Sequence, residues 1–258
     1  MRKTNKFFIA LAAIFAATVS LTSCDNHKHY YSSLWSYDAE SHWHDAVCEH
    51  IEQGDRESHE WTEVTTTSGT KTVCSVCGKE KKENATYEVD ASAFTNAINN
   101  IDNFTYNSVS IADDTTSRTT IYNVNNDRMK YETDTTTQLW VNQNGSYVVY
   151  TLAEDKTSWN TSSQPVNITL ISTKYALSSS FSNYSNFTFN SDNKSYTCET
   201  TETFGGMDTY AYYSFYFEDG KLLNAYIKTK TTQDEKTSIV TVQLTNIGTT
   251  EDFDTPSN

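Results

Sequence analysis

Histidine is missing from most of this chain. All six histidines lie before residue 60, and none occurs in the remaining 199 residues. Proline is also scarce, with Pro165 and Pro256 as the two examples, so strands are rarely interrupted. Because a nucleophilic triad needs an imidazole as its base, the histidine-free part excludes that kind of hydrolase. We assign no catalytic residue to the chain.

Positive charge is the second deficit. The chain has 19 Lys and Arg against 33 Asp and Glu, and its formal net charge is −14. Three of the basic residues lie within residues 1–23, so the remainder carries −17. A nucleic-acid backbone would be repelled by this field, which excludes DNA and RNA as partners. The acidity favours solubility and disfavours electrostatic adhesion to anionic lipid headgroups.

Apolar runs are short, and the longest lies at the start of the chain. The run over residues 7–21 follows three basic residues and is closed by Thr22, Ser23 and Cys24. Its 15 residues are too few for a permanent membrane span, and the layout is typical of an export signal. It resembles the signal peptides of bacterial lipoproteins, which implies cleavage before an acylated Cys24. We expect residues 1–23 to be removed and Cys24 to hold the protein on a membrane of the bacterial envelope, outside the cytoplasm. An ordinary secretory signal with an incidental cysteine is the alternative.

A Cys-x-x-Cys-Gly motif begins at Cys74. The thiolates of Cys74 and Cys77 can face one metal ion, and Gly78 permits the tight backbone turn beneath it. We expect Cys48 and His59 to complete a tetrahedral Zn²⁺ site. Four protein ligands leave no position for water or substrate, so this zinc would be structural and would cross-link a small module with little aliphatic content.

Other interpretations of these residues remain open. The oxidising exterior favours a disulfide between two of the cysteines, and a Cys-x-x-Cys pair can also be redox-active. Competitors for the imidazole position are His42, His44 and His50. Metal scavenging from the medium is a further possibility, for which the candidate ligands are His27, His29, His42 and His44.

The order of these residues resembles short zinc-ribbon-like modules near the N-termini of bacterial surface lipoproteins. The segments that carry the resemblance are His42-Trp43-His44, Cys48-Glu49-His50, His59-Glu60-Trp61 and the motif that begins at Cys74. We place this module and its tether at residues 24–84. The charged run over residues 79–84 is interpreted as a solvated connector to a second domain.

From Tyr87 onward, short segments alternate between apolar and polar residues, which is the period of half-buried strands. The clearest segments cover residues 147–152, 209–217, 222–228 and 238–244. Turn signals separate the strands, at Asn144-Gly145, Asp219-Gly220 and the weaker Asn125-Asn126-Asp127. The pattern predicts an antiparallel meander.

Two helices are expected in this second domain, at residues 85–258. Asp90 is placed as the N-cap of a helix over Ala91–Ile101, whose apolar residues recur on one face. A weaker helix is expected over Ser172–Ser180. The fold class is therefore α+β with mostly antiparallel β structure, and the domain is long enough to bury one core.

This order of elements resembles the lipoprotein-carrier (LolA-like) superfamily. The hairpin Phe-Glu-Asp-Gly-Lys-Leu at residues 217–222 and the ending Asn-Ile-Gly-Thr-Thr at residues 246–250 add to the resemblance, which covers most of residues 86–254. It implies a curved, open half-barrel sheet with one or two helices on its concave face, holding a lipid or acyl chain. It implies no catalytic residues.

Large apolar residues of the strands are the candidates for lining such a cavity, because every second side chain of a strand points inward. They are Trp140, Val149, Trp159, Ile168, Leu170, Tyr212 and Phe215. The same residues would also fill an ordinary core. A cell-surface module that binds carbohydrate or protein is the alternative function, since the many aromatic rings offer flat faces for stacking. Carboxylate pairs such as Glu251-Asp252 fall in polar runs typical of solvated surface, which disfavours a glycosidase.

Overall fold

The computed structural model describes residues 29–48, 51–66, 69–112, 115–125, 127–144, 146–164, 184–204, 207–233 and 236–256. Several predictions from the sequence lie outside these residues. They concern the signal segment 1–23, the anchor Cys24, the cavity candidates Ile168 and Leu170, and the weak helix over Ser172–Ser180.

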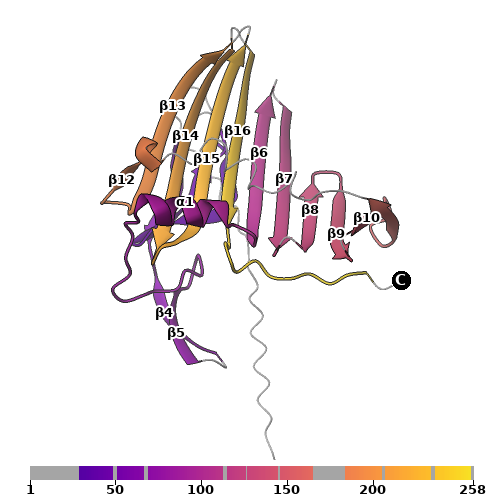
Figure 1. Cartoon of the computed structure of the whole chain (residues 1–258), viewed down its shortest axis with the longest axis horizontal. Helices are drawn as coiled ribbons and strands as arrows, with labels where there is room; N and C mark the ends of the chain where they lie inside the picture. Colours follow the sequence, from indigo (N-terminus) through magenta and orange to yellow (C-terminus); the bar gives the residue numbers. More distant parts are fainter. Residues whose placement is uncertain are drawn as a thin grey trace, which may run out of the picture.

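Eleven antiparallel strands form one large, curved, unclosed sheet (Figure 1). From one edge to the other they are β11 (Trp159–Gln164), β10 (Ser146–Leu152), β9 (Thr137–Gln143), β8 (Arg128–Thr133), β7 (Thr115–Val124), β6 (Phe104–Ala112), β16 (Lys236–Thr245), β15 (Lys221–Gln233), β14 (Met207–Glu218), β13 (Ser195–Phe204) and β12 (Thr188–Asn190). The predicted antiparallel meander is confirmed. The pairing of β6 with β16 joins the two halves of the meander in the middle of the sheet.

The predicted turns connect the predicted strands. Gln143 pairs with Ser146 across Asn144-Gly145, and Glu218 pairs with Lys221 across Asp219-Gly220. In the second turn both central residues have positive φ, 52° and 74°, as a type I′ hairpin requires. Glycine carries the second of these angles without strain.

Helix α1 (Ala91–Asn99) begins as predicted and ends two residues earlier than predicted. The side chain of Asp90 accepts a hydrogen bond of 2.8 Å from the backbone N–H of Ala93, which caps the first turn. We call the sheet face that α1 covers the front face. Beneath the helix the core is filled, because several side chains there have no exposed surface. They are Phe94, Phe104, Phe215, Phe217 and Leu244.

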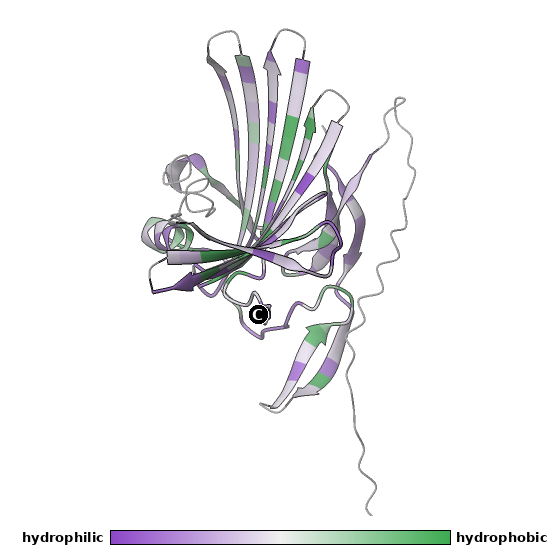
Figure 2. Ribbon diagram, turned by 90° about the vertical axis from the view of Figure 1, so that its right-hand side faces the viewer, coloured by the Kyte–Doolittle hydropathy of each residue, from purple (hydrophilic) through white to green (hydrophobic). Residues whose placement is uncertain are grey.

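The opposite face, here called the back face, carries the N-terminal strands (Figure 2). β1 (Tyr31–Tyr37), β2 (Ser41–Ala46) and β3 (Gln53–Ser58) form a three-stranded sheet. It is fastened to the large sheet by hydrogen bonds from Gln243 Nε2 to Asp45 Oδ2 (2.9 Å) and from Tyr226 Oη to the Ala46 carbonyl (3.1 Å). β4 (Trp61–Thr66) and β5 (Gly69–Cys74) form a separate hairpin, which projects from the molecule in Figure 1.

The prediction of a solvated connector over residues 79–84 is wrong at its first residue. Lys79 is buried, and its Nζ lies 2.6 Å from Glu218 Oε2, with both side chains at most 5% exposed. Residues 80–84 are exposed, as predicted. The opposite charge of Glu218 explains the burial, because a buried ammonium group is tolerated when it is paired and hydrogen-bonded. The Cys/His region is therefore packed against the large sheet.

Candidate metal centre

Four side chains of the N-terminal region converge on one point. They are His42 in β2, His59 between β3 and β4, Cys74 at the end of β5, and Cys77 in the turn that follows. Their ligand atoms all lie within 4.8 Å of one another. Cys74 Sγ is 3.8 Å from His42 Nδ1, and Cys77 Sγ is 3.5 Å from His59 Nδ1. Sulfur and nitrogen ligands of one tetrahedral zinc ion lie about 3.6 Å apart, so the cluster has the dimensions of such a site.

The β4–β5 hairpin and its turn position both thiols. The backbone N–H of Ser75 donates to the Glu60 carbonyl (2.8 Å), which holds the turn next to the segment that contains His59. The N–H of Gly78 donates to the Cys74 carbonyl (3.0 Å), and Gly78 has a φ of 77°. The predicted role of this glycine in closing the Cys-x-x-Cys turn is confirmed.

Both imidazoles are held in the form that binds metal. Burial lowers the pKa of His42 and of His59, so both rings are neutral near pH 7. His59 Nε2 lies 3.1 Å from the Asp38 carbonyl, a contact that leaves Nδ1 directed at Cys77. His42 Nε2 is buried without a hydrogen-bond partner. The other ring nitrogen, Nδ1, faces Cys74 Sγ, so a metal bound through Nδ1 would leave Nε2 as a buried N–H donor.

The two thiols differ in acidity. Burial raises the pKa of Cys74, but the backbone amides of Cys77, Val76 and Glu60 outweigh it, so the pKa lies below its ordinary value. Burial and the neighbouring Cys74 raise the pKa of Cys77 to about 12. A metal ion therefore has to displace the proton of Cys77 when it binds.

The structure corrects the predicted ligand set at one position, since His42 and not Cys48 joins His59, Cys74 and Cys77. Cys48 lies beyond the other end of β2, with its Sγ 3.4 Å from His29 Nδ1. A strand advances about 3.3 Å per residue, so six residues of near-extended chain separate positions 42 and 48 by up to about 20 Å. The competing His44 instead stacks on Trp35, with ring centroids 3.7 Å apart.

No disulfide links the described cysteines. Cys48, Cys74 and Cys77 are free thiols, and so is Cys198, which is buried on the front face of β13. The side chains that approach the Cys-x-x-Cys pair are imidazoles. The geometry of this cluster is accordingly that of a metal site.

The predicted cavity-lining residues do not share one face. Phe215, Trp140 and Val149 point to the front face, where Phe215 is part of the closed core beneath α1. Tyr212 and Trp159 fall on the back face, because successive residues of a strand point to opposite faces. Tyr212 lies three residues before the front-face residue Phe215. Trp159 pairs with Leu152, which lies three residues after the front-face residue Val149. These residues cannot line a single cavity.

Beside the closed core, the front face has a pocket of about 280 Å³, here called the front-face pocket. Its apolar part includes Phe187, Ala211 and Tyr213, and the ring of Phe187 lies 5.1 Å from that of Phe215 in the core. The rest of its lining is Asn186, Cys198, Thr200, Glu202, Thr209 and Thr229. None of these was predicted as a ligand-binding residue, because small and polar strand residues carry no distinct sequence signal.

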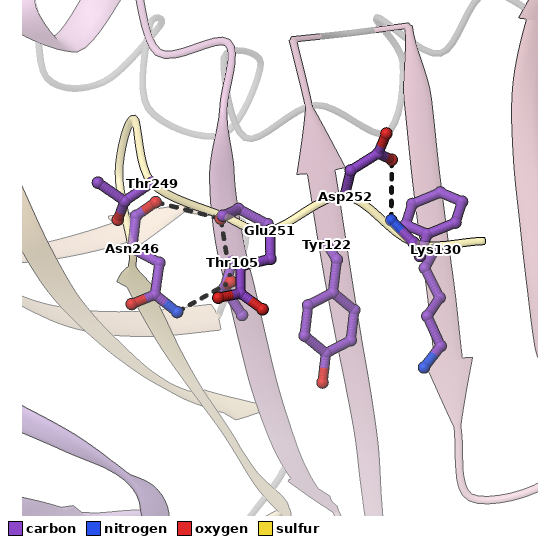
Figure 3. Close-up of a pocket in the computed structure, with 9 residues that line it drawn as sticks. Thr105, Tyr122, Lys130, Asn246, Thr249, Glu251 and Asp252 are labelled. Carbon is purple, nitrogen blue, oxygen red and sulfur yellow. Dashed lines mark hydrogen bonds between the residues drawn. The ribbon is translucent and has the colours of Figure 1, made fainter. Parts of the chain in front are cut away.

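A second pocket, of about 410 Å³, lies where the C-terminal tail crosses the back face (Figure 3). Thr105, Tyr122 and Lys130 lie beneath the tail, and Asn246 Nδ2 donates to Thr105 Oγ1 (3.3 Å). The tail adds the carboxylates of Glu251 and Asp252. This charged and polar lining does not suit a hydrophobic ligand.

Comparison of the sequence with models of known protein families gives no match, and comparison with curated proteins gives none either. Within the described residues, no helix has the length and apolar character needed to cross a membrane. The function is therefore argued from the geometry of the metal centre and of the front face.

Proposed function

We propose that this protein is a non-catalytic binding protein of the bacterial cell envelope, anchored by an acylated Cys24, that holds a hydrophobic ligand on the front face of its large sheet. The front-face pocket is the observation that carries the proposal. It continues the aromatic core through Phe187 and Tyr213, and it is lined by residues 186–187 and by strands β13–β15, on the sheet face that α1 also covers. This is the arrangement that the LolA-like resemblance implies.

The lining of the pocket defines the class of ligand. Phe187, Ala211 and Tyr213 form an apolar part, whereas Thr200 and Glu202 form a polar part. Pockets for small organic ligands occupy about 300–1,000 Å³, so a volume of about 280 Å³ suits a short amphiphile or the end of a longer acyl chain. The apolar end of the ligand would contact the rings of Phe187 and Tyr213, and its polar group would lie near the hydroxyl of Thr200.

The zinc ion that we propose for His42, His59, Cys74 and Cys77 has a structural role. Two thiolates and two imidazoles are ligands that Zn²⁺ prefers, and together they occupy all four tetrahedral positions. After purification and gel filtration, elemental analysis should find one tightly held zinc per chain. A Cys77→Ser variant should lose it, and loss of zinc from a Cys198→Ser control as well would contradict this assignment.

Membrane attachment follows from the proposed acylation. His29, the first described residue, lies five residues after Cys24, and five extended residues span at most about 18 Å. The N-terminal sheet would therefore lie close to the lipid surface. Two or more acyl chains hold a protein firmly to a membrane, whereas one holds it only marginally.

Co-purification tests the ligand. The full chain, isolated from membranes and extracted with organic solvent, should release a lipid that mass spectrometry identifies. Thr200→Trp fills the front-face pocket and should lower binding of a medium-chain fluorescent fatty acid by about tenfold or more. Glu199→Trp is the matched control, because this neighbour points to the back face. Absence of lipid together with unchanged binding by the Thr200→Trp variant would refute the proposal.

A second candidate function rests on a group of aromatic side chains. On the front face of β6–β10, partly buried rings surround Ile121 and Met129. They belong to Tyr106, Tyr131, Trp140 and Tyr147. Such rings stack on sugars or on a partner protein. Retention on glycans that a Trp140→Ala variant loses, with no lipid extracted, would favour this surface-binding function.

A further inference from the structure

A second group of metal-ligand side chains lies beyond the other end of β2. Cys48 Sγ is 3.4 Å from His29 Nδ1, and the same nitrogen is 3.4 Å from Glu52 Oε2. Cys48 and His29 are 2% and 8% exposed, whereas the side chain of Glu52 is 48% exposed. The thiol and the imidazole are thus sheltered, and the carboxylate faces solvent.

Two of the three separations between these ligand atoms, those that involve His29, are typical of ligands on one metal ion. With zinc–sulfur, zinc–nitrogen and zinc–oxygen bonds of ordinary length, tetrahedral geometry puts sulfur about 3.6 Å and oxygen about 3.4 Å from the nitrogen. Both observed distances are within a few tenths of an ångström of these values. The carboxylate of Glu52 has to turn toward the Cys48 thiol to bring all three ligand atoms together. Because its side chain is 48% exposed, it can do so without disturbing the core.

Neighbouring residues hold the imidazole and the carboxylate. The ring of Tyr31 stacks beside that of His29, with centroids 6.3 Å apart, and its hydroxyl donates to Glu52 Oε2 at 3.5 Å. Gly54 makes room for this ring, since a Cβ there would lie 2.7 Å from Tyr31 Cδ1. Supporting contacts of this kind orient first ligands in metal sites.

A catalytic cysteine–histidine–carboxylate triad does not fit the same residues. In a triad the nucleophile and the carboxylate contact different nitrogens of the imidazole. Here Cys48 and Glu52 both contact Nδ1 of His29. The thiol is also 2% exposed, which leaves no room for a substrate.

We propose that His29, Cys48 and Glu52 form a second metal site, for a thiophilic divalent cation of the Zn²⁺ class. Three protein ligands leave the fourth position to water, and one of the three is an exposed carboxylate. We therefore expect this ion to be held more weakly than the ion bound by four protein ligands. On binding, the Cys48 thiol loses its proton to solvent and the thiolate bonds to the metal. The metal-gathering role considered for the histidines is thereby assigned to His29 and not to His42.

Titration of the metal-free full chain with Co²⁺, followed by thiolate-to-metal absorption, tests the second site. We expect a tight equivalent and a weaker one. Cys48→Ser should abolish the weaker equivalent and leave the tight one, and Glu52→Gln, on the exposed side, should weaken it by about tenfold or more. Cys77→Ser should act on the tight equivalent alone.

Cys198→Ser is the control for loss of an unrelated buried thiol and should keep both equivalents. A single equivalent in the unmodified chain would overturn the second site, and so would a weaker equivalent that survives in Cys48→Ser. Loss of the tight equivalent in Cys198→Ser, with the weaker one kept, would instead count against the zinc centre proposed above.

Discussion

Glu218 links the Cys-x-x-Cys turn to the large sheet. Its carboxylate oxygens lie 2.6 Å from Lys79 Nζ, 3.1 Å from Lys82 Nζ and 3.0 Å from the Tyr216 hydroxyl. Its side chain is 2% exposed. Lys79 lies two residues after Cys77, so its ion pair with Glu218 adjoins the Cys-x-x-Cys turn. A buried charge left without its partner is destabilising, which makes the pair sensitive to truncation on either side.

We expect Lys79→Met to lower the free energy of unfolding by about 3 kcal/mol, because it leaves Glu218 buried with weaker pairing. Urea unfolding followed by circular dichroism measures this change. Lys71→Met is the matched control, since Lys71 pairs with Glu80 at 2.7 Å while both side chains are more than 40% exposed. Its expected cost is below about 1 kcal/mol. Equal costs for the two variants would contradict the role assigned to Lys79.

The same carboxylate predicts a pH dependence. Burial raises the pKa of Glu218, but the hydrogen bonds and charges of Lys79 and Lys82 outweigh it, so the pKa lies below 4.5. A carboxylate with a lowered folded-state pKa stabilises the fold above its unfolded value, and the stability is lost as pH falls through the folded value. Stability should therefore fall as the pH drops below the ordinary pKa of a glutamate, 4.5. In Glu218→Gln the same titration of urea midpoints should be flatter.

At the scale of elements, the β4–β5 hairpin has few buried side chains to stabilise it. The segment over residues 79–81 pairs with one edge of it, through hydrogen bonds from the Cys74 N–H to the Lys79 carbonyl and from the Lys81 N–H to the Thr72 carbonyl (both 2.8 Å). Most residues of the hairpin are exposed or half-buried. A two-stranded hairpin is marginally stable alone in water. The metal centre lies at its base, where Cys74 is the last residue of β5. The proposed zinc therefore adds a constraint at the base of a hairpin that buries little surface of its own.

Removal of metal should act on this element first. With a chelator present, hydrogen exchange should speed up over residues 61–74 and leave the central strands β14–β16 protected, because their core does not contact the metal. Exchange measured by mass spectrometry with and without chelator checks this. Unchanged protection of the hairpin would show that the cluster does not hold a structural metal.

At the scale of the whole molecule, the two halves of the open sheet are joined at its centre by strands from the two ends of the domain sequence. β6 comes directly after α1, and its partner β16 is the last strand. β16 also carries Gln243, which binds the N-terminal sheet on the back face. One strand thus joins both halves of the meander, the core under α1 and the N-terminal sheet.

A chain that ends after Gln233 lacks β16 and should not fold, because β6 and β15 lose their shared neighbour. Far-ultraviolet circular dichroism and sedimentation should show an unfolded or aggregated product. The control ends after Thr255, which keeps the contacts of Arg128 with Asp252 and with Thr255 itself. A folded product from the shorter chain would mean that the halves of the sheet are independent.

Local patterns in the sequence were sufficient for the strands around residues 147–152, 209–217, 222–228 and 238–244, for α1 with its Asp90 cap, and for the Asp219-Gly220 turn. They also identified Cys74, Cys77 and His59 as a group. The strands, the helix cap, the turn and the Cys74–Cys77 pair depend on residues a few positions apart, whose relative placement the backbone geometry dictates.

The tertiary structure was needed for every feature that depends on contacts between residues far apart in the sequence. It replaced Cys48 by His42, because the extended β2 holds these residues at opposite ends. It divided the predicted cavity residues between two faces, because a shift of one residue in strand register turns every side chain over. It buried Lys79, because Glu218, 139 residues later in the sequence, neutralises its charge. Side-chain period is a local property, whereas ligand choice, face and charge pairing depend on which strands meet.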